Sequence, residues 1–579
     1  MKLYIYILSL ITCMLSFLSC GDMLDQYPKD QVSPENFFTT ENELKLYTNS
    51  LLFIFPATSL YTEAVDNIVK QGLEDEVSGI RDASTVGGWS WENLRKVNFF
   101  LDNSHKCPDT KVRTKYDAIA RFFRAYFYFD MVRRFGDVPW YSHTFSETNT
   151  EQLYKKRDPR QLVTDSMLVD IDFAITNLGT EKKLNEVTRW TALALKSRFC
   201  LFEGTFRKYH GIDGWERFID ESIAASEALI AGKKYAIYTG NGKDVAYRDL
   251  FASINAEPTE VITARGYSAE LQIFHNCNYY TLTSSYGQPG LEKQLIDSYL
   301  MADGSRFTDK TDYDKLFYYD EMQNRDPRLY QTIRGPGYKR IDGTHKEIPQ
   351  FGFTVTGYQP IKYVCASNYD MYNKNENDLI IYRYAEVLLN LAEAKAERGT
   401  LTQNDIDRTI QLLRDRVGMP NMDMAAANAK PDPFMAAQYP LVTGSNQGAI
   451  LEIRRERRIE LVMENLRYYD VMRWKAGKQF ERPFKGIYFP GPGFYDFDGD
   501  GKPDVCVYEK GKKPTDLKGV SQTLEIGNNI LLEHGTYGNI IVNPNIKKVW
   551  NENRDYLFPI PITELILNPD LKQNPGWED

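Results

Sequence analysis

The chain has 579 residues and a formal net charge of −9 at neutral pH, with 70 Lys and Arg against 79 Asp and Glu. This acidic balance argues against nucleic-acid binding, which needs a basic face to neutralise phosphates. The length exceeds that of one small domain, although a helical-repeat protein of this size can form one continuous body.

The first twenty residues have the pattern of a secretion signal. Lys2 precedes an apolar run over residues 3–18, and Ser19 and Cys20 follow it. The run is too short to span a bilayer comfortably, and the cysteine stands where the run stops. We therefore expect residues 1–19 to be a lipoprotein signal peptide and Cys20 to carry the lipid. The alternative is an ordinary signal peptide, in which Cys20 is incidental.

Helical periodicity dominates the next part of the chain, and we expect a helical-repeat scaffold over about 36–235. Thr40 is placed to cap the first helix. Apolar side chains then recur at helical spacing in residues 115–136, 189–206 and 217–232. Large aromatic residues alternate with alanines in these segments, which is typical of helix pairs such as tetratricopeptide units.

The scaffold resumes over about 376–475, between two irregular segments. We expect helices over 379–399 and 405–418, and one long helix over 450–477. Residues of about 236–375 are rich in Tyr, Gly, Asn and Ser, and residues of about 480–550 are rich in Gly, Pro and Asp. Long irregular insertions on a helical scaffold commonly carry function. The predicted fold is therefore mainly α, with tetratricopeptide-like repeats, long loop insertions and a few short strands.

Several longer motifs follow one another along the chain in a fixed order. They are SPENFF (33–38), RAYFYFDMVRRFGDVPW (124–140), LIDSYLMADGSRF (295–307) with RDPRLYQTIRGPG (325–337), IIYRYAEVLLNLAEAKAERG (380–399), IRRERRIELVMENLRYYDVMRW (453–474) and YLFPIPITELILNPDLKQNPGWED (556–579). In these motifs, nearly end to end, the chain resembles the RagB/SusD family. The family consists of extracellular lipoproteins that serve two-component outer-membrane nutrient uptake systems.

The resemblance implies one SusD-like domain over 20–579, with a ligand face in the 236–375 insertion and a C-terminal motif over 555–579. It also implies an outward-facing protein, lipid-anchored in the cell outer membrane. Such a protein binds a nutrient oligomer, most often a glycan, without catalysis, and delivers it to a SusC-like TonB-dependent transporter. Two alternatives stay open: the same architecture with peptide cargo, and a surface glycosidase. The second lacks support, because no HExxH, GxSxG, Walker or dinucleotide motif is present.

Aromatic residues in irregular sequence are the ligand candidates, because sugar rings pack their C–H faces on aromatic rings. We expect a shallow site that combines aromatic rings with polar partners. The aromatic candidates are Trp89, Tyr267, Tyr279, Tyr280 and Tyr286, and the polar ones are Asp75, Arg81, Asn276 and Asn278. By resemblance, the loop around Trp89 contributes a stacking ring, whereas Trp91 is expected to pack inward.

The segment DFDGDGKPD predicts a calcium loop. Asp496, Asp498, Asp500 and Asp504 stand at positions 1, 3, 5 and 9 of such a loop, and Gly501 stands at position 6. Position 12 is Val507 instead of glutamate, and a strand is expected after the loop where a helix would follow in an EF-hand. The alternative is a solvated acidic turn without an ion. Ca²⁺ is the one cofactor that the sequence suggests.

Two further features are expected to be structural. The alternating charges of IRRERRIE (453–460) favour ion pairs along and between helices over a phosphate site. The five cysteines beyond Cys20 are widely spaced and include no CxxC pair, so we expect several buried free thiols and no structural zinc site.

Overall fold

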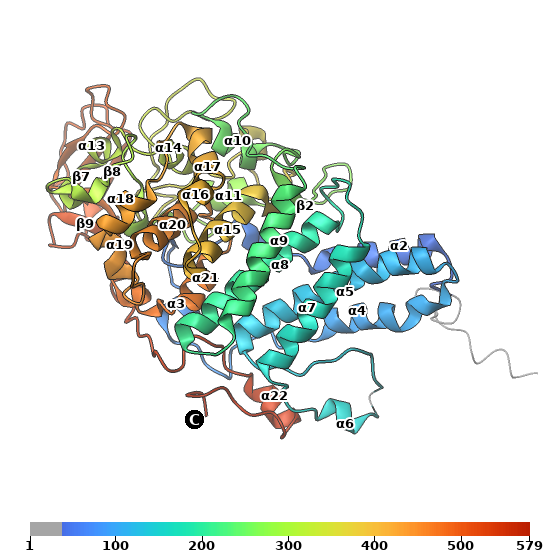
Figure 1. The fold of residues 1–579 in the computed structure, drawn as a ribbon. Coiled ribbons are helices and arrows are strands. Elements are labelled where there is room, and N and C mark those ends of the chain that lie inside the picture. Colours follow the sequence, from blue (N-terminus) through green and yellow to red (C-terminus); the bar gives the residue numbers. More distant parts are fainter. Residues whose placement is uncertain (1–36, 147, 579) are drawn as a thin grey trace, which may run out of the picture.

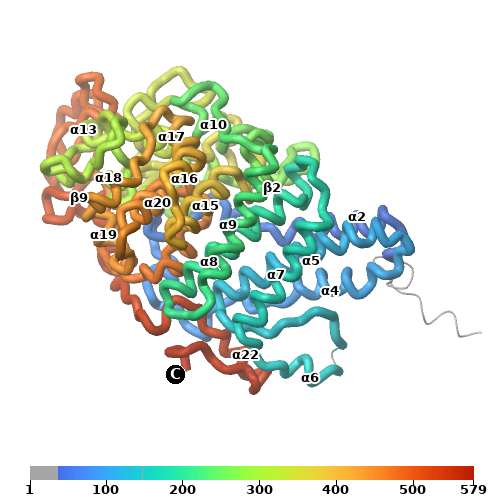
Figure 2. The backbone as a smooth tube through the Cα atoms, in the orientation of Figure 1, coloured from blue at the N-terminus to red at the C-terminus, as the bar shows by residue number. Residues whose placement is uncertain are grey.

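The computed structural model describes residues 37–146 and 148–578. Helices make up most of its regular structure, as the sequence predicts. In Figure 1 the long N-terminal helices lie side by side, and the later elements gather at one end of them. Figure 2 shows that the C-terminal chain returns to the N-terminal helices. No helix within the described residues is long and apolar enough to cross a membrane.

The N-terminal scaffold begins where the caps predict. The side chain of Thr40 accepts a hydrogen bond from Glu43 N, and the Glu43 carboxylate accepts one from Thr40 N. This reciprocal pair of hydrogen bonds is a capping box. Asp109 caps the longest of the described helices, where its side chain accepts hydrogen bonds from Lys111 N and Val112 N. The long helices are α2 (Glu41–Ser50), α4 (Glu92–Asn103), α5 (Thr110–Phe135), α7 (Arg160–Asn177), α8 (Arg189–His210) and α9 (Trp215–Ala231). The short ones are η1 (Leu51–Ile54), η2 (Thr58–Leu60), α3 (Asp75–Ser78), η3 (Ser104–Lys106) and α6 (Thr150–Leu153).

Small residues let α8 and α9 pack closely. A Cβ at Gly204 would lie 2.7 Å from Ile219 Cδ1, so a larger residue at this position would separate the two helices. Ser197 and Ser226 join the helices through a buried hydroxyl pair at 2.8 Å. The two segments 189–206 and 217–232, both predicted to be helical, therefore pack against each other.

The second part of the scaffold differs from prediction at two points. Residues 379–383 form strand β4 (Leu379–Arg383), and the helix α15 (Tyr384–Arg398) starts only after it. The single long helix expected over 450–477 is wrong. The chain instead forms α20 (Gln447–Glu460) and α21 (Arg467–Arg473), because Met463 (φ 61°) and Asn465 (φ 58°) turn it into the left-handed region between them. The other helices are α16 (Gln403–Asp407), α17 (Ile410–Val417), α18 (Met424–Ala429) and α19 (Pro433–Gln438).

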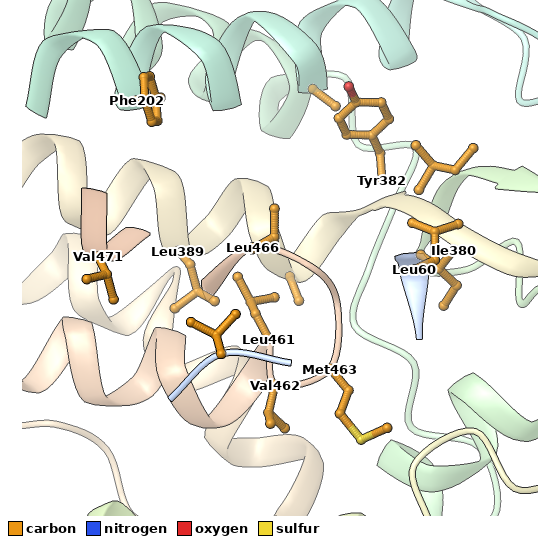
Figure 3. Packing of buried hydrophobic residues seen from close by; sticks show 14 of the residues in the cluster. Leu60, Phe202, Ile380, Tyr382, Leu389, Leu461, Val462, Met463, Leu466 and Val471 are labelled. Atoms are coloured by element: carbon orange, nitrogen blue, oxygen red, sulfur yellow. The ribbon is translucent and has the colours of Figure 1, made fainter. Parts of the chain in front are cut away.

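The turn between α20 and α21 is part of the hydrophobic core. Leu461, Val462 and Met463 are almost fully buried. Figure 3 shows Leu461 and Leu466 beside Leu389 of α15. Burial of these side chains holds the turn in place despite its unfavourable backbone angles.

The residues 236–375 contain short elements and long connections. They comprise α10 (Ala246–Ala252), β2 (Val261–Arg265), α11 (Cys277–Leu282), β3 (Gly290–Leu291), α12 (Lys293–Ser298), η4 (Phe307–Asp309), η5 (Tyr313–Lys315), α13 (Tyr318–Met322), α14 (Pro327–Thr332) and η6 (Ser367–Tyr369). Strand β2 pairs with β4, and β3 pairs with β1 (Ile68–Val69), both antiparallel. These pairings attach the insertion to the scaffold.

The Gly- and Asp-rich segment forms most of the remaining strands. They are β5 (Phe484–Phe489), β6 (Gly493–Tyr495), β7 (Val505–Glu509), β8 (Gln522–Ile526) and β9 (Gly538–Val542), after the turn η7 (Gly477–Glu481). Strands β5 and β9 form an antiparallel pair. Strand β7 is the middle strand of a second sheet, in which it pairs antiparallel with β6 and parallel with β8. The strand predicted directly after the Asp-rich loop is β7.

The C-terminal motif packs back on the first helices. Phe558 N donates to Arg134 O of α5 at 2.7 Å, and Arg157 Nη1 donates to Lys572 O at 2.8 Å. The motif contains the helix α22 (Ile562–Leu567). The C-terminal motif is therefore fastened to the end of α5 and to the segment that precedes α7.

The IRRERRIE segment is structural, as predicted. All of its charged side chains are buried in α20. Glu460 accepts hydrogen bonds from Arg328 (3.1 Å), Arg383 (2.8 Å) and Arg416. These partners come from other elements, so the segment joins helices through the core. The five described cysteines are also buried and free, as expected.

Candidate functional site

The predicted ligand residues occupy three neighbouring places. The tyrosines of the insertion form a tyrosine cluster, which we define as Tyr279, Tyr280, Tyr286 and Tyr372. Asp75 and Arg81 line an acidic cleft, which we define as two adjoining cavities described below. Trp89 lies in a third, aromatic cavity. The structure thus divides the single site that the sequence predicts.

The tyrosine cluster presents rings to solvent. Tyr279 lies in α11, and its ring is 5.7 Å from that of Tyr286 and 5.6 Å from that of Tyr372, both edge-on. Tyr286 is 39% exposed and Tyr372 is 57% exposed. Sequence reasoning missed Tyr372, although it stands in an Asn- and Asp-rich stretch similar to those of the other candidates.

Asn276 and Asn278 support the cluster from within. Both are buried. Asn278 Oδ1 accepts a hydrogen bond from Cys365 N at 2.9 Å, and its Nδ2 donates one to Asp370 Oδ1 at 2.9 Å. Asn276 Nδ2 donates a hydrogen bond to Asn373 Oδ1 at 3.0 Å. Their amides therefore fasten α11 to the segment that carries Tyr372. The prediction that these two residues are ligand-facing polar partners does not fit their burial.

Tyr267 and Tyr280 lie beneath the exposed rings. Tyr280 is 3% exposed, and the centre of its ring lies 6.1 Å from that of Tyr286. Tyr267 is partly buried and packs edge-on against His275 at 4.5 Å. Of the four tyrosines predicted here, Tyr279 and Tyr286 remain available to a ligand.

The acidic cleft consists of two cavities of about 670 Å³ and about 280 Å³. They share Glu74, Glu76, Arg134 and Phe558. The larger cavity runs between η2, α5 and α21, and tyrosines from the two helices line it. The smaller one is lined by Asp75, which is exposed in the first turn of α3.

The acidic cleft and the tyrosine cluster are neighbours. Tyr61 contacts Tyr280 at 5.9 Å, and Glu63, two residues later, lines the larger cavity. Gln71 N donates to Gly287 O at 2.6 Å, next to Tyr286.

Arg81 is held by the C-terminal segment. It is 6% exposed, and its guanidinium donates to Asp555 O and lies 4.7 Å from the centre of the Phe558 ring. Trp577 and Trp550 flank the same guanidinium at 5.7 and 5.9 Å. These contacts indicate a structural role for Arg81, in place of the predicted ligand contact.

The two tryptophans have the reverse of the expected burial. Trp89 is 8% exposed and packs edge-on against Phe135 at 5.0 Å, whereas Trp91 is only partly buried. Both line an aromatic cavity of about 610 Å³ with Tyr141 and residues of the C-terminal motif. Trp89 is buried because α5 and Phe135 lie directly behind the glycine-rich loop that carries it.

The Asp-rich loop brings three of its four predicted ligands together. Carboxylate oxygens of Asp496, Asp498 and Asp504 lie within 4.8 Å of one another, and Asp500 stands outside this group among the described residues. Asp496 accepts Gly501 N at 2.7 Å, and Gly501 has φ 82°, so the glycine bends the loop as predicted. Burial and the charges of Asp498 and Asp496 raise the pKa of Asp504. A divalent cation would relieve that repulsion, so the donor set fits Ca²⁺.

Comparison with known proteins extends the family resemblance. Residues 259–577 match the model of the SusD family. SusD-like protein P38 of Formosa agariphila is 23% identical over 505 residues, which cover 81% of this chain and 91% of that protein. SusD-like protein P2 of the same organism is 21% identical over 597 residues, and 99% of each chain is covered.

Solved structures share the fold. A SusD-like protein from Bacteroides fragilis superposes with a TM-score of 0.68 at 22% identity, over 95% of this chain and 100% of that chain. A SusD-like carbohydrate binding protein from the same species gives a TM-score of 0.67 at 20% identity, over 93% and 100%. The family match covers more than half of the sequence, and the fold agrees over nearly all of it. The chain therefore belongs to the SusD family.

Proposed function

We propose that this protein captures a glycan at the cell surface, without cleaving it, and delivers it to a TonB-dependent outer-membrane transporter of the SusC type. The observation that carries the proposal is the exposed tyrosine cluster beside the acidic cleft. Aromatic rings bind the apolar faces of sugars, and carboxylates and tyrosine hydroxyls bind their hydroxyl groups. A structural neighbour described as a SusD-like carbohydrate binding protein supports the same function.

The cluster is suited to a long ligand. Tyr279, Tyr286 and Tyr372 come from two segments that the buried amides of Asn276 and Asn278 hold together. Rings fixed in this way lose little entropy on binding, so each contact contributes fully to affinity. Peptide cargo would instead need backbone hydrogen-bond partners along an extended surface.

The test is a glycan array followed by calorimetry with the glycan that binds. We expect Tyr286→Ala and Tyr372→Ala each to weaken binding by about 1–3 kcal/mol, the scale of one lost aromatic contact, with the fold unchanged. Tyr154→Ala, an exposed tyrosine at the aromatic cavity, is the control and should bind normally. Binding as tight as wild type in a Tyr286→Ala/Tyr372→Ala variant would show that the site lies elsewhere.

Anchoring and delivery complete the proposal. Cys20 lies outside the described residues, and we propose that it carries the lipid that holds the protein on the outer face of the outer membrane. The absence of catalysis is tested by incubating the bound glycan with the protein. Chromatography should show no shortened products, and their appearance would favour a glycosidase.

A further inference from the structure

The acidic cleft has an excess of negative groups. Six carboxyl groups and three guanidinium groups line its two cavities. The carboxyl groups belong to Glu63, Glu74, Asp75, Glu76, Asp82 and Asp130, and the guanidinium groups to Arg81, Arg133 and Arg134. The sign of this charge bears on which ligand can enter.

The three arginines are already engaged by the protein. Arg133 binds Asp130 at 2.6 Å and stacks 3.8 Å from the centre of the Tyr469 ring. Arg134 donates to Gly87 O at 2.8 Å and lies over Phe558. Arg81 is held by Asp555 and three rings, with Nε and Nη1 buried and unpartnered. Asp555 lies 3.8 Å from Arg81 and also pairs with Arg554 at 2.7 Å, so it offsets part of the charge of Arg81.

Neighbouring cations neutralise the negative charges of the carboxyl groups only in part. Glu74 pairs with Lys70, and Asp130 with the two arginines of α5. Asp75 and Asp82 are exposed at the smaller cavity, and Glu76 is partly exposed at both. Coulomb repulsion therefore opposes the entry of an acidic group.

Glu63 gives the cleft an unpartnered polar atom. It is 3% exposed; Oε2 accepts Asn465 N at 3.0 Å, while Oε1 has no partner. The nearest cations are committed elsewhere, Arg467 to Asp66 at 2.7 Å and Lys362 to Glu464 at 2.7 Å. The hydroxyl of Tyr468, which lines the same cavity, is also buried and unpartnered. Unpartnered buried polar atoms that line a cavity point to a ligand that completes their hydrogen bonds.

We propose that the acidic cleft selects saccharides by charge: it accepts neutral units, binds amine-bearing units more tightly at Glu63 and Glu76, and rejects uronic and sulfated units. This inference rests on the proposed glycan function and names the substrate class of that site. A protonated amine offers several N–H donors to both carboxyl groups, and its positive charge is attracted to Glu76 and to the exposed Asp75 and Asp82 beside it. An acidic sugar would instead bring a further negative charge beside Asp75, Glu76 and Asp82.

The experiment is a panel of oligosaccharides of equal length, sorted by charge, and titrated at low and at physiological salt. The probes are glucosamine oligomers, their N-acetylated counterparts, neutral glucans and oligogalacturonates, and an oligolysine peptide represents basic cargo. We expect glucosamine oligomers to bind at least tenfold more tightly than the N-acetylated ones, and oligogalacturonates to bind most weakly. The preference for the amine should shrink as salt increases, because screening weakens charge pairs.

Matched variants assign the preference to the cleft. Glu76→Gln should reduce the tenfold preference towards unity, while Glu186→Gln, an exposed carboxylate outside the cleft, should leave it unchanged. If oligogalacturonates bind as tightly as the other probes, the charge selection is wrong although glycan binding stands. If the peptide binds more tightly than every saccharide, the occupant is a basic peptide and the inference fails. If no saccharide in the panel or in a wider array binds, the proposed function itself is overturned.

Discussion

At the scale of single residues, aromatic side chains with a similar sequence context differ in how far they are buried. Trp89 and Tyr372 both stand in irregular polar segments, yet Trp89 is 8% exposed and Tyr372 is 57% exposed. A buried ring contributes to stability through the apolar surface that it removes from water. An exposed ring can instead bury its apolar surface against a ligand and so contribute to binding.

The first prediction concerns Trp89. Trp89→Ala should lower the free energy of unfolding by about 3–5 kcal/mol, because it removes a large side chain packed on Phe135 and Trp91. Urea denaturation measures the change, and Tyr372→Ala is the control, expected to unfold like wild type. A Trp89→Ala variant of normal stability with lost glycan binding would restore Trp89 as a ligand residue.

The second prediction concerns Glu63. Burial raises the pKa of its carboxyl group to about 8, and the nearby Asp66 charge adds to the shift. The folded state therefore binds a proton that the unfolded state releases near the ordinary value of 4.5. Stability from this group is complete below about 4.5 and is lost as the pH rises through about 8.

Comparison with Glu63→Gln isolates that effect. Between pH 4.5 and pH 8 the wild type should lose on the order of 3 kcal/mol of unfolding free energy relative to the variant, whose amide does not titrate. Chemical denaturation at several pH values provides the measurement. Parallel stability curves for the two proteins would mean that Glu63 is ionised at neutral pH.

At the scale of elements, the Asp-rich loop shows how backbone geometry chooses among similar side chains. The loop joins β6 to β7, and the strand pairing fixes both of its ends. Between them Asp496, Asp498 and Asp504 converge, while Asp500 points to a position where Lys502 lies 3.7 Å away. We propose Ca²⁺ binding by the three converging carboxylates.

The third prediction tests this proposal. Asp498→Ala/Asp504→Ala should abolish the rise in Tm that calcium gives to the wild type, because only binding to the native state stabilises. Asp500→Ala is the matched control and should keep most of the rise. The proposal fails if the wild-type melting curves in calcium and in chelator coincide.

At the scale of the whole molecule, the C-terminal motif closes the fold on the N-terminal helices. Asp555 holds Arg81, and Phe558 binds the end of α5, so residues far apart in sequence form the walls of the acidic cleft. The helical scaffold thereby places the cleft and the tyrosine cluster on one continuous body. In the proposed function, this body presents the bound ligand to the transporter.

The fourth prediction concerns that transporter. We expect the wild-type protein to co-purify with a TonB-dependent barrel from membranes in mild detergent. Cys20→Ala should leave the membrane fraction, because the lipid is lost, and should keep its glycan affinity. Isolation of the wild-type protein alone, from an extract that contains the transporter, would contradict delivery to it.

The sequence by itself determined the helical scaffold, the cap at Thr40 and the family. These features depend on local periodicity and on contiguous motifs, which a linear sequence displays directly. It also placed Tyr279, Tyr286 and the four aspartates of the Asp-rich loop among the functional candidates, and the structure brings three of those aspartates together. Local signals failed in the turn between α20 and α21, where burial of Leu461 and Val462 outweighs the helical pattern.

Only the tertiary structure decided which candidates face a ligand. Tyr372 joins Tyr279 across a long stretch of sequence, and Glu63 gains its high pKa from burial among distant elements. Trp89 packs on α5, Arg81 binds the C-terminal motif, and Asn278 binds the segment that carries Tyr372. These contacts bury the three side chains within the protein. Exposure and charge compensation are properties of packed surroundings, so no local pattern in the chain specifies them.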